Sequence, residues 1–287
     1  MKPGSEGVKK EEKMDRDHPE LDRKYFNLQE ILRKMKGLLV AFSGGVDSTL
    51  LLKVAKDTLG NKILAVTAQS ETTAPLEIRE ARKLAEDLGI EHLVVKSEEL
   101  ELSEFIKNPP DKCYFCKKLR FGHLVELARV RGFPYVVDGT NADDHQDHRP
   151  GGKATQELGI RSPLREALLS KREIRLLSKK LKLPTWNKQP NACLASRIPY
   201  GQPITREKLR QVDAGEAFIR GLGLTGQVRV RHYGDLARLE VDAENLKKIV
   251  EKRMREKIIP YFKALGFQFV TLDLEGYFMG SLNRVIH

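Results

Sequence analysis

Residues 38–49 read Leu-Leu-Val-Ala-Phe-Ser-Gly-Gly-Val-Asp-Ser-Thr, and this stretch decides the fold. Its apolar residues 38–42 predict a buried strand, and the pattern of residues 48–59 predicts a helix soon after it. The two glycines between them allow a sharp turn and a close approach of the backbone to a ligand. A helix that starts here directs free N–H groups and the positive end of its dipole into the loop. The stretch therefore predicts a phosphate-binding loop, although it lacks the Gly-Lys-Ser/Thr of a Walker A motif.

The sequence around this loop continues the alternation of strands and helices. Residues 63–66, 93–95 and 135–137 predict strands, and residues 75–88 and 114–131 predict helices. Continuous apolar strands that alternate with amphipathic helices are typical of an α/β domain, in which helices cover both faces of a parallel sheet.

A different pattern begins at Thr205. A helix at 205–221, a hairpin at 228–241, a helix at 243–264 and a strand at 267–274 predict a smaller α+β domain with an antiparallel sheet. We therefore divide the chain into a mobile tail at 1–20, an α/β domain at 21–200 and a C-terminal α+β domain at 201–287 that binds substrate or joins subunits.

Two polar stretches lie before this boundary. We expect residues 141–170 to form loops with one short helix, and His145, Asp147 and His148 to belong to a polar loop rather than a metal site. The basic residues 171–182 predict a helix whose charged face is solvated.

Composition limits the class of protein. The chain of 287 residues carries 51 Lys and Arg against 40 Asp and Glu, a net charge of +11 that favours anionic partners such as ATP or phosphorylated substrates. No apolar run is long enough to span a bilayer, and the N-terminus lacks the apolar core of a signal peptide. We therefore expect a cytoplasmic protein, in which three cysteines indicate metal or redox chemistry rather than a disulfide framework.

The cysteines occur in two places. Cys113 and Cys116 form a CxxC at the start of a predicted helix, and Cys193 lies in the segment Asn-Ala-Cys-Leu-Ala-Ser-Arg. The residues alone leave three alternatives: a thioredoxin-like redox pair, a zinc site that needs a fourth ligand, and an iron–sulfur cluster on three thiolates. Such a cluster would leave one iron open to bind sulfide.

Charged residues suggest two further sites. Asp138, Asp143 and Asp144 follow a predicted strand, where carboxylates could hold the Mg²⁺ of a nucleotide, unless they form a solvated acidic loop. Arg229 and Arg231 alternate with valines and so point to one face of a strand, where they suit a phosphate unless that face is solvated.

The quoted motifs resemble those of a known family. Ser-Gly-Gly-Val-Asp-Ser resembles the PP-loop of the ATP pyrophosphatases, which have an adenine nucleotide alpha hydrolase-like fold. Together with DGTNADD, NACLASRIPYG and RVRHYGDLARLE, it makes the chain similar to the LarE family from about residue 25 onward. The resemblance implies an ATP-dependent sulfur transferase that forms AMP and pyrophosphate. It would adenylate a carboxylate of pyridinium-3,5-dicarboxylate mononucleotide and convert it to a thiocarboxylate of the nickel-pincer nucleotide of lactate racemase.

The resemblance also implies roles for single residues. Those that would bind ATP and Mg²⁺ are Ser43, Gly44, Gly45, Asp47, Ser48, Thr49, Gly139 and Asn141, with Asp47 also catalytic. Those that would bind the substrate are Arg229 and Arg231 as a phosphate clamp, and Glu216. We add Arg197 to the substrate-binding residues because it lies four residues after Cys193, where its charge can neutralise an adenylate or a thiolate.

Family members differ in the source of sulfur. In some, a cysteine matching Cys193 gives up its own sulfur, and in others three cysteines hold a [4Fe–4S] cluster. Because Cys113, Cys116 and Cys193 are all present, we expect the catalytic cluster form rather than sacrificial transfer. The family forms hexamers, so a homo-oligomer is expected. A tRNA thiolation enzyme is the main alternative and a non-catalytic nucleotide-binding regulator is another, but we expect a small-molecule substrate because no RNA-binding domain is recognisable.

Overall fold

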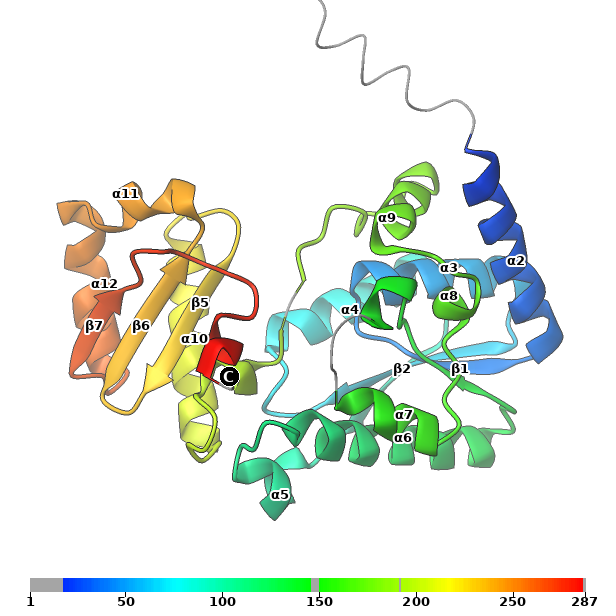
Figure 1. Ribbon diagram of the computed structural model, residues 1–287, viewed down its shortest axis with the longest axis horizontal. Helices are drawn as coiled ribbons and strands as arrows, with labels where there is room; N and C mark the ends of the chain where they lie inside the picture. Colours follow the sequence, from blue (N-terminus) through cyan, green and yellow to red (C-terminus); the bar gives the residue numbers. More distant parts are fainter. Residues whose placement is uncertain (1–17, 146–149, 191, 286–287) are drawn as a thin grey trace, which may run out of the picture.

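The computed structural model describes residues 18–145, 150–190 and 192–285 (Figure 1). Most of the predicted mobile tail, residues 1–17, lies outside the described residues, as do Asp147 and His148 of the predicted polar loop. The last residues assigned to that tail, Pro19 and Glu20, already belong to the first helix, α2 (Pro19–Met35).

A parallel sheet of four strands forms the centre of the N-terminal part. Its strand order is β3-β2-β1-β4, and each pair of neighbours is parallel. The strands are β1 (Leu38–Ala41), β2 (Ile63–Gln69), β3 (His92–Lys96) and β4 (Val136–Val137). The predicted α/β class is therefore confirmed, with each predicted strand present in the sheet.

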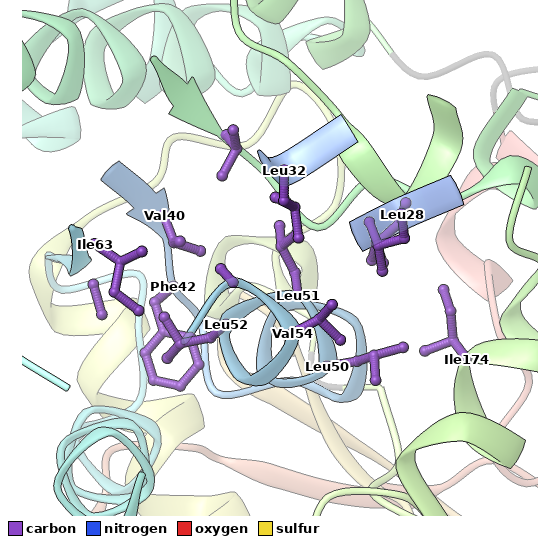
Figure 2. Packing of buried hydrophobic residues seen from close by; sticks show 14 of the residues in the cluster. Leu28, Leu32, Val40, Phe42, Leu50, Leu51, Leu52, Val54, Ile63 and Ile174 are labelled. Atoms are coloured by element: carbon purple, nitrogen blue, oxygen red, sulfur yellow. The ribbon is translucent and has the colours of Figure 1, made fainter. Parts of the chain in front are cut away.

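Helices cover both faces of this sheet (Figure 1). On one face lie α2, α3 (Val46–Leu59), α4 (Pro75–Asp87) and α9 (Lys171–Lys180), and on the other lies α6 (Lys112–Arg131). Figure 2 shows the leucines of α3 packed between α2 and the strands. On β1 the pleat divides the side chains: Val40 packs into this cluster, and Leu39 packs with Phe121 of α6. Strands buried on both faces explain the continuous apolar runs in the sequence.

The stretch 141–170 contains more helix than the single short one predicted. It forms η3 (Ala142–His145), α7 (Gly151–Glu157) and α8 (Pro163–Glu166). Pro163 opens α8 at a position where its missing N–H costs nothing, so this proline starts a helix rather than a loop. Before α6 the chain also forms η2 (Glu99–Glu101) and α5 (Ser103–Ile106).

The C-terminal part has a three-stranded sheet of order β5-β6-β7. Strands β5 (Val228–Tyr233) and β6 (Leu236–Val241) form the predicted hairpin, with Gly234 at φ 69° in its turn. The prediction of an antiparallel sheet is wrong for β7 (Phe269–Leu272), which lies parallel to β6. The helices between them, which include α11 (Leu246–Ile249) and α12 (Lys252–Ala264), return the chain to the start of β6, as a parallel crossover requires.

The core of this second unit also takes in residues that precede it in the sequence. Besides the strands, α10 (Arg206–Gly221) and α12, it includes Leu194 and Ile198 from the Cys193 segment, and Leu100 and Phe105 from the η2–α5 region. The short helices η4 (Leu194–Arg197) and η6 (Ser281–Val285) lie at this junction (Figure 1). The segment with Cys193 therefore lies between the N-terminal part, with the four-stranded sheet, and the C-terminal part, with the three-stranded sheet.

None of the helices in the described ranges is long and apolar enough to cross a membrane.

Candidate active site

The loop after β1 has the geometry of a phosphate site. Gly44 has φ 67°, and a Cβ there would lie 3.3 Å from Ala81 of α4, so both backbone conformation and packing require glycine. The Ser43 and Ser48 hydroxyls share a 3.1 Å hydrogen bond, and the Thr49 hydroxyl donates to the Gly45 carbonyl at 2.7 Å. The loop is thus held in shape by its own side chains at the N-terminus of α3, where free N–H groups favour an anion.

The loop after β4 lies directly against this phosphate loop. A Cβ on Gly139 would lie 3.0 Å from the backbone nitrogen of Ser48, so this approach depends on glycine. Asn141 donates from its side chain to Asp47 at 3.2 Å. The carboxylate of Asp47 also accepts a hydrogen bond from Lys171, at the start of α9. The structure therefore brings together the residues from both loops that sequence reasoning assigned to the nucleotide.

These loops enclose a cavity of about 860 Å³. Asp138, Asp143 and Asp144 line it; Asp138 is buried and Asp143 is exposed, so the acidic segment faces both the cavity and solvent. Three cations from one stretch of chain, Lys171, Arg175 and Lys188, also line it. Lys171 and Arg175 belong to the basic helix predicted at 171–182, whose other basic residues Arg172, Lys179 and Lys180 are exposed as predicted.

Lys188 fixes the far side of the phosphate loop. Its ammonium donates to the Gly44 carbonyl at 2.9 Å and to the Glu80 carboxylate at 2.7 Å. Sequence reasoning missed both Lys171 and Lys188, because each lies far along the chain from the loop that it contacts and neither belongs to a recognised motif. Positive charge around a phosphate loop balances the charge of a triphosphate.

All three cysteines line a second cavity, of about 410 Å³. Cys113 and Cys193 are exposed, whereas Cys116 is half-buried, and burial raises the pKa of the Cys116 thiol to about 12. Within residues 18–145, 150–190 and 192–285, no three Cys, His, Asp or Glu side chains are grouped closely enough to hold a metal ion. The structure thus gathers the cysteines around one space without placing their sulfurs at ligand distances from a common centre.

The two cavities share part of their walls. Ala41, Ser43, Glu77 and Asp138 line both, so the cavity at the phosphate loop and the cavity at the cysteines are adjacent. Burial raises the pKa of Glu77.

A buried polar cluster supports the CxxC helix on one side. Arg120, one turn beyond Cys116, donates to the Glu99 carboxylate, to the Ser70 hydroxyl at 3.0 Å and to the Thr72 hydroxyl at 2.9 Å. Glu99 is fully buried, and the Cys116 thiol approaches its carboxylate at 3.8 Å.

Asn108 fastens the N-terminal end of this helix to the segment after Cys193. Its side-chain amide donates to the carbonyls of Ile198, Pro199 and Gln202 at 3.2, 2.7 and 3.0 Å. Lys112 in turn donates to the Asn108 side-chain oxygen. Nothing in the sequence pattern singles out Asn108, although its position four residues before Lys112 fits this contact.

Arg197 and Glu216 form a buried pair beneath Cys193. The two side chains make paired hydrogen bonds of 2.6 and 2.9 Å, and both residues are 3% exposed or less. Arg197 also donates to the carbonyls of Ala192 and Cys193 at 2.7 and 3.1 Å. In this arrangement the pair fixes the backbone that carries Cys193, and the substrate contacts predicted for both residues stay predictions.

Arg229 and Arg231 project from β5 toward the same segment, as their alternation predicts. Arg229 donates to the Pro190 carbonyl at 3.2 Å, and Arg231 donates to the Ser196 carbonyl at 2.8 Å. Both are buried, and burial, with help from the neighbouring Arg197, lowers the pKa of Arg229 to about 10. The two arginines therefore bracket the Cys193 segment from either side.

Comparisons with known proteins agree with this geometry. The family model of NAD synthase matches residues 17–113. A pyridinium-3,5-bisthiocarboxylic acid mononucleotide synthase from Lactiplantibacillus plantarum is 38% identical over 93% of this chain and 96% of its own length. An uncharacterized protein from Synechocystis is 44% identical over 93% of this chain and 99% of its own length. A GMP synthase from Aeropyrum pernix is 31% identical over 63% of this chain but only 39% of that enzyme.

The parallel sheet, the SGGVDS loop at the end of its strand β1 and the NAD synthase match define an ATP-using enzyme of the PP-loop ATP pyrophosphatase class. The likeness to GMP synthase stops short of the whole chain, whereas the likeness to the L. plantarum synthase extends through the second unit with Arg229 and Arg231. The chain belongs to the LarE family of ATP-dependent sulfur transferases.

Proposed function

We propose that the chain adenylates a carboxylate of pyridinium-3,5-dicarboxylate mononucleotide with ATP and then replaces an oxygen with sulfur. The first step would release pyrophosphate, and attack by sulfur on the activated carbon would release AMP and leave a thiocarboxylate. The observation that carries the proposal is the wall shared by the nucleotide cavity and the cysteine cavity. The L. plantarum relative, named for a bisthiocarboxylic acid mononucleotide, supports this choice of substrate.

ATP would occupy the first cavity with its phosphates on the loop. The N-terminus of α3 and the hydroxyls of Ser43 and Ser48 supply hydrogen-bond donors. Asp47 would take part in holding Mg²⁺, as carboxylates do in phosphate sites. Lys171, which now pairs with Asp47, would then turn to the phosphates and stabilise the departing pyrophosphate.

The substrate's own phosphate would bind to the arginines of β5. Among the described residues, Arg229 donates only to carbonyls and lies over the Tyr277 ring at 5.1 Å, so its buried charge has no carboxylate partner. Arg231 is paired with Glu240 at 2.7 Å. A phosphate would supply the counter-charge that Arg229 lacks.

The three cysteines would hold a [4Fe–4S] cluster, whose open iron supplies a transferable sulfide when the cluster is bound. Their chemistry fits, because three thiolates are the donors such a cluster needs and all three line one cavity. Cys113 and Cys116 lie one helical turn apart at the start of α6, and Cys193 directly precedes η4. Direct transfer from Cys193, with loss of its sulfur, is the alternative within the same site.

The proposed function also includes a division into domains, an oligomeric state and a cellular location. The domains are 21–200 for ATP and 201–287 for substrate or subunit contacts, and the enzyme is a homo-oligomer. A cytoplasmic location would give it ATP and keep its cysteines reduced.

The experiment follows the products of a single mixture. The chain is incubated anaerobically with ATP, Mg²⁺, sulfide and the pyridinium dicarboxylate mononucleotide, and AMP, pyrophosphate and thiocarboxylate are measured together. We expect the three products to form in parallel. Thiolated tRNA, formed when tRNA replaces the mononucleotide, would instead favour the tRNA enzyme, and AMP without any sulfur product would contradict both.

A further inference from the structure

Lys112 is a buried cation on the wall of the cysteine cavity. It is the first residue of α6, directly before Cys113, and it is 6% exposed although lysine is ordinarily a surface residue. Its ammonium donates to the Asn108 side-chain oxygen and to the Ala195 carbonyl at 3.5 Å, and lies 4.5 Å from the centre of the Tyr200 ring.

All of these partners are neutral. Among the described residues, no carboxylate lies within ion-pair distance of Lys112, and the nearby groups that can carry negative charge are the thiols of Cys113 and Cys193. Burying an ammonium without a counter-charge is costly, and folded proteins ordinarily pair such a group with an anion. A neutral hydrogen-bond donor could make the same contacts to Asn108 and Ala195, so holding the Cys193 segment does not by itself require a charged side chain.

Arg120 is a second cation of α6 with which Lys112 can be compared. It lies two turns further along the same helix, on the same side as Lys112 and with Cys116 between them, because residues four apart share a helix face. Arg120 has its counter-charge in Glu99, whereas Lys112 has no carboxylate partner among the described residues. Lys112 therefore places a positive charge without a paired carboxylate beside Cys113 on the wall of this cavity.

We propose that Lys112 is a positioning residue that supplies the counter-charge for anionic sulfur in this cavity, whether thiolate or hydrosulfide. This inference rests on the proposed role of the cysteines in sulfur transfer and names the group that draws the sulfur anion to them. The Lys112 ammonium attracts a negatively charged sulfur species to the end of the cavity next to Cys193. It does not attract a neutral thiol in this way.

The test compares an anionic and a neutral alkylating agent of similar size. The whole 287-residue chain, stripped of metal and kept reduced, is treated with iodoacetate or iodoacetamide, and the rate at Cys193 is measured by peptide mass spectrometry. The same thiolate attacks both agents and displaces iodide from each, so the ratio of the two rates cancels the fraction of thiolate and reports the local potential. ATP and substrate are absent, so the result does not depend on whether the proposed reaction occurs.

We expect Lys112→Gln to lower the iodoacetate-to-iodoacetamide ratio roughly fivefold, the effect of about 1 kcal/mol from a unit charge a few ångströms away. Lys112→Arg keeps the charge and should keep the ratio. Lys118→Gln is the matched control, because Lys118 lies on the same helix but is exposed and paired with Glu157. An unchanged ratio in Lys112→Gln would overturn the inference, as would a drop in Lys117→Gln alone, since Lys117 also lines the cavity.

The wild-type chain gives a second measurement that needs no variant to fold. Its ratio at Cys193 should exceed that of the denatured chain and should fall toward it as salt is added, because salt screens the attraction. A native ratio equal to the denatured one would refute a positive potential at this sulfur even if every Lys112 variant failed to fold.

Discussion

Glu216→Gln is expected to destabilise the protein strongly, because it breaks a buried ion pair without changing the shape of the side chain. The Glu216 carboxylate accepts hydrogen bonds from Arg197 at 2.6 and 2.9 Å, from Arg220 at 2.8 Å and from the Val230 backbone at 3.2 Å. The side chains of Arg197 and Glu216 are 3% and 2% exposed, so water cannot replace the lost partner. The variant leaves the Arg197 charge buried and unpaired.

The magnitude follows from this burial. Removing one partner of a buried pair costs about 3–5 kcal/mol, whereas exposed pairs contribute up to about 1 kcal/mol. With a urea dependence of roughly 2–3 kcal/mol per molar, the midpoint of unfolding should fall by about 1–2.5 M. The matched control is Glu157→Gln, which removes a partly exposed carboxylate paired with Lys118 at 3.0 Å. It should shift the midpoint by less than about 0.5 M.

The loss of stability caused by Glu216→Gln should depend on pH in a defined direction. Burial acts to raise the pKa of Glu216, but the charge of Arg197 more than offsets this and holds the pKa below its ordinary value of 4.5. The stabilisation is therefore fully present above pH 4.5 and is lost as the pH falls through the lowered pKa. The difference between wild type and Glu216→Gln should be constant from neutral pH to about pH 5 and shrink below it.

The assay is urea unfolding of both variants and the wild type, followed by circular dichroism at neutral pH and at a series of lower values. Equal midpoints for Glu216→Gln and the wild type at neutral pH would refute the reasoning, since the buried Arg197 would then tolerate the loss of the carboxylate that pairs with it. A difference that grew with falling pH would refute the assigned sign of the pKa shift.

Two further predictions concern the proposed chemistry. Asp47→Ala should abolish ATP-dependent pyrophosphate release while the fold is kept, because Asp47 belongs to the phosphate loop and lines the first cavity. The control variant Asp57→Ala, on the exposed side of the same helix, should keep this release. Unchanged release in Asp47→Ala would remove Asp47 from the mechanism. Arg229→Ala and Arg231→Ala should each weaken binding of the mononucleotide roughly ten- to a hundred-fold while leaving ATP binding unaltered, since a charge-assisted contact contributes about 1.5–3 kcal/mol; calorimetry that found equal losses for both ligands would contradict the phosphate clamp.

The fold could be predicted from the sequence because its signals are local. The apolar run 38–42 and the glycines after it specify a strand, a turn and a helix without reference to distant residues, and the structure forms all three. The alternation of Arg229 and Arg231 with valines likewise set both side chains on one face of β5. The parallel pairing of β7 was missed, because a strand's direction depends on where the preceding helices return the chain.

The environment of the site could not be predicted in the same way. Lys171 meets Asp47 across 124 positions of sequence, and only the packing of α9 against α3 brings them together. Lys112 has an ordinary polar sequence context, and its burial follows from the Asn108 contacts with the segment after Cys193. Sequence patterns thus identified the cysteines and the phosphate loop, and tertiary packing supplied the charges around them.

The central claim is that sulfur reaches the activated carbon from a centre held by Cys113, Cys116 and Cys193. The most direct measurement is the mass of the protein after anaerobic turnover with sulfide supplied, together with the number of thiocarboxylates formed per chain. The account predicts several products per chain, an intact Cys193, and loss of turnover in each of the three Cys→Ala variants. One product per chain with dehydroalanine at position 193 would contradict it and establish sacrificial transfer instead.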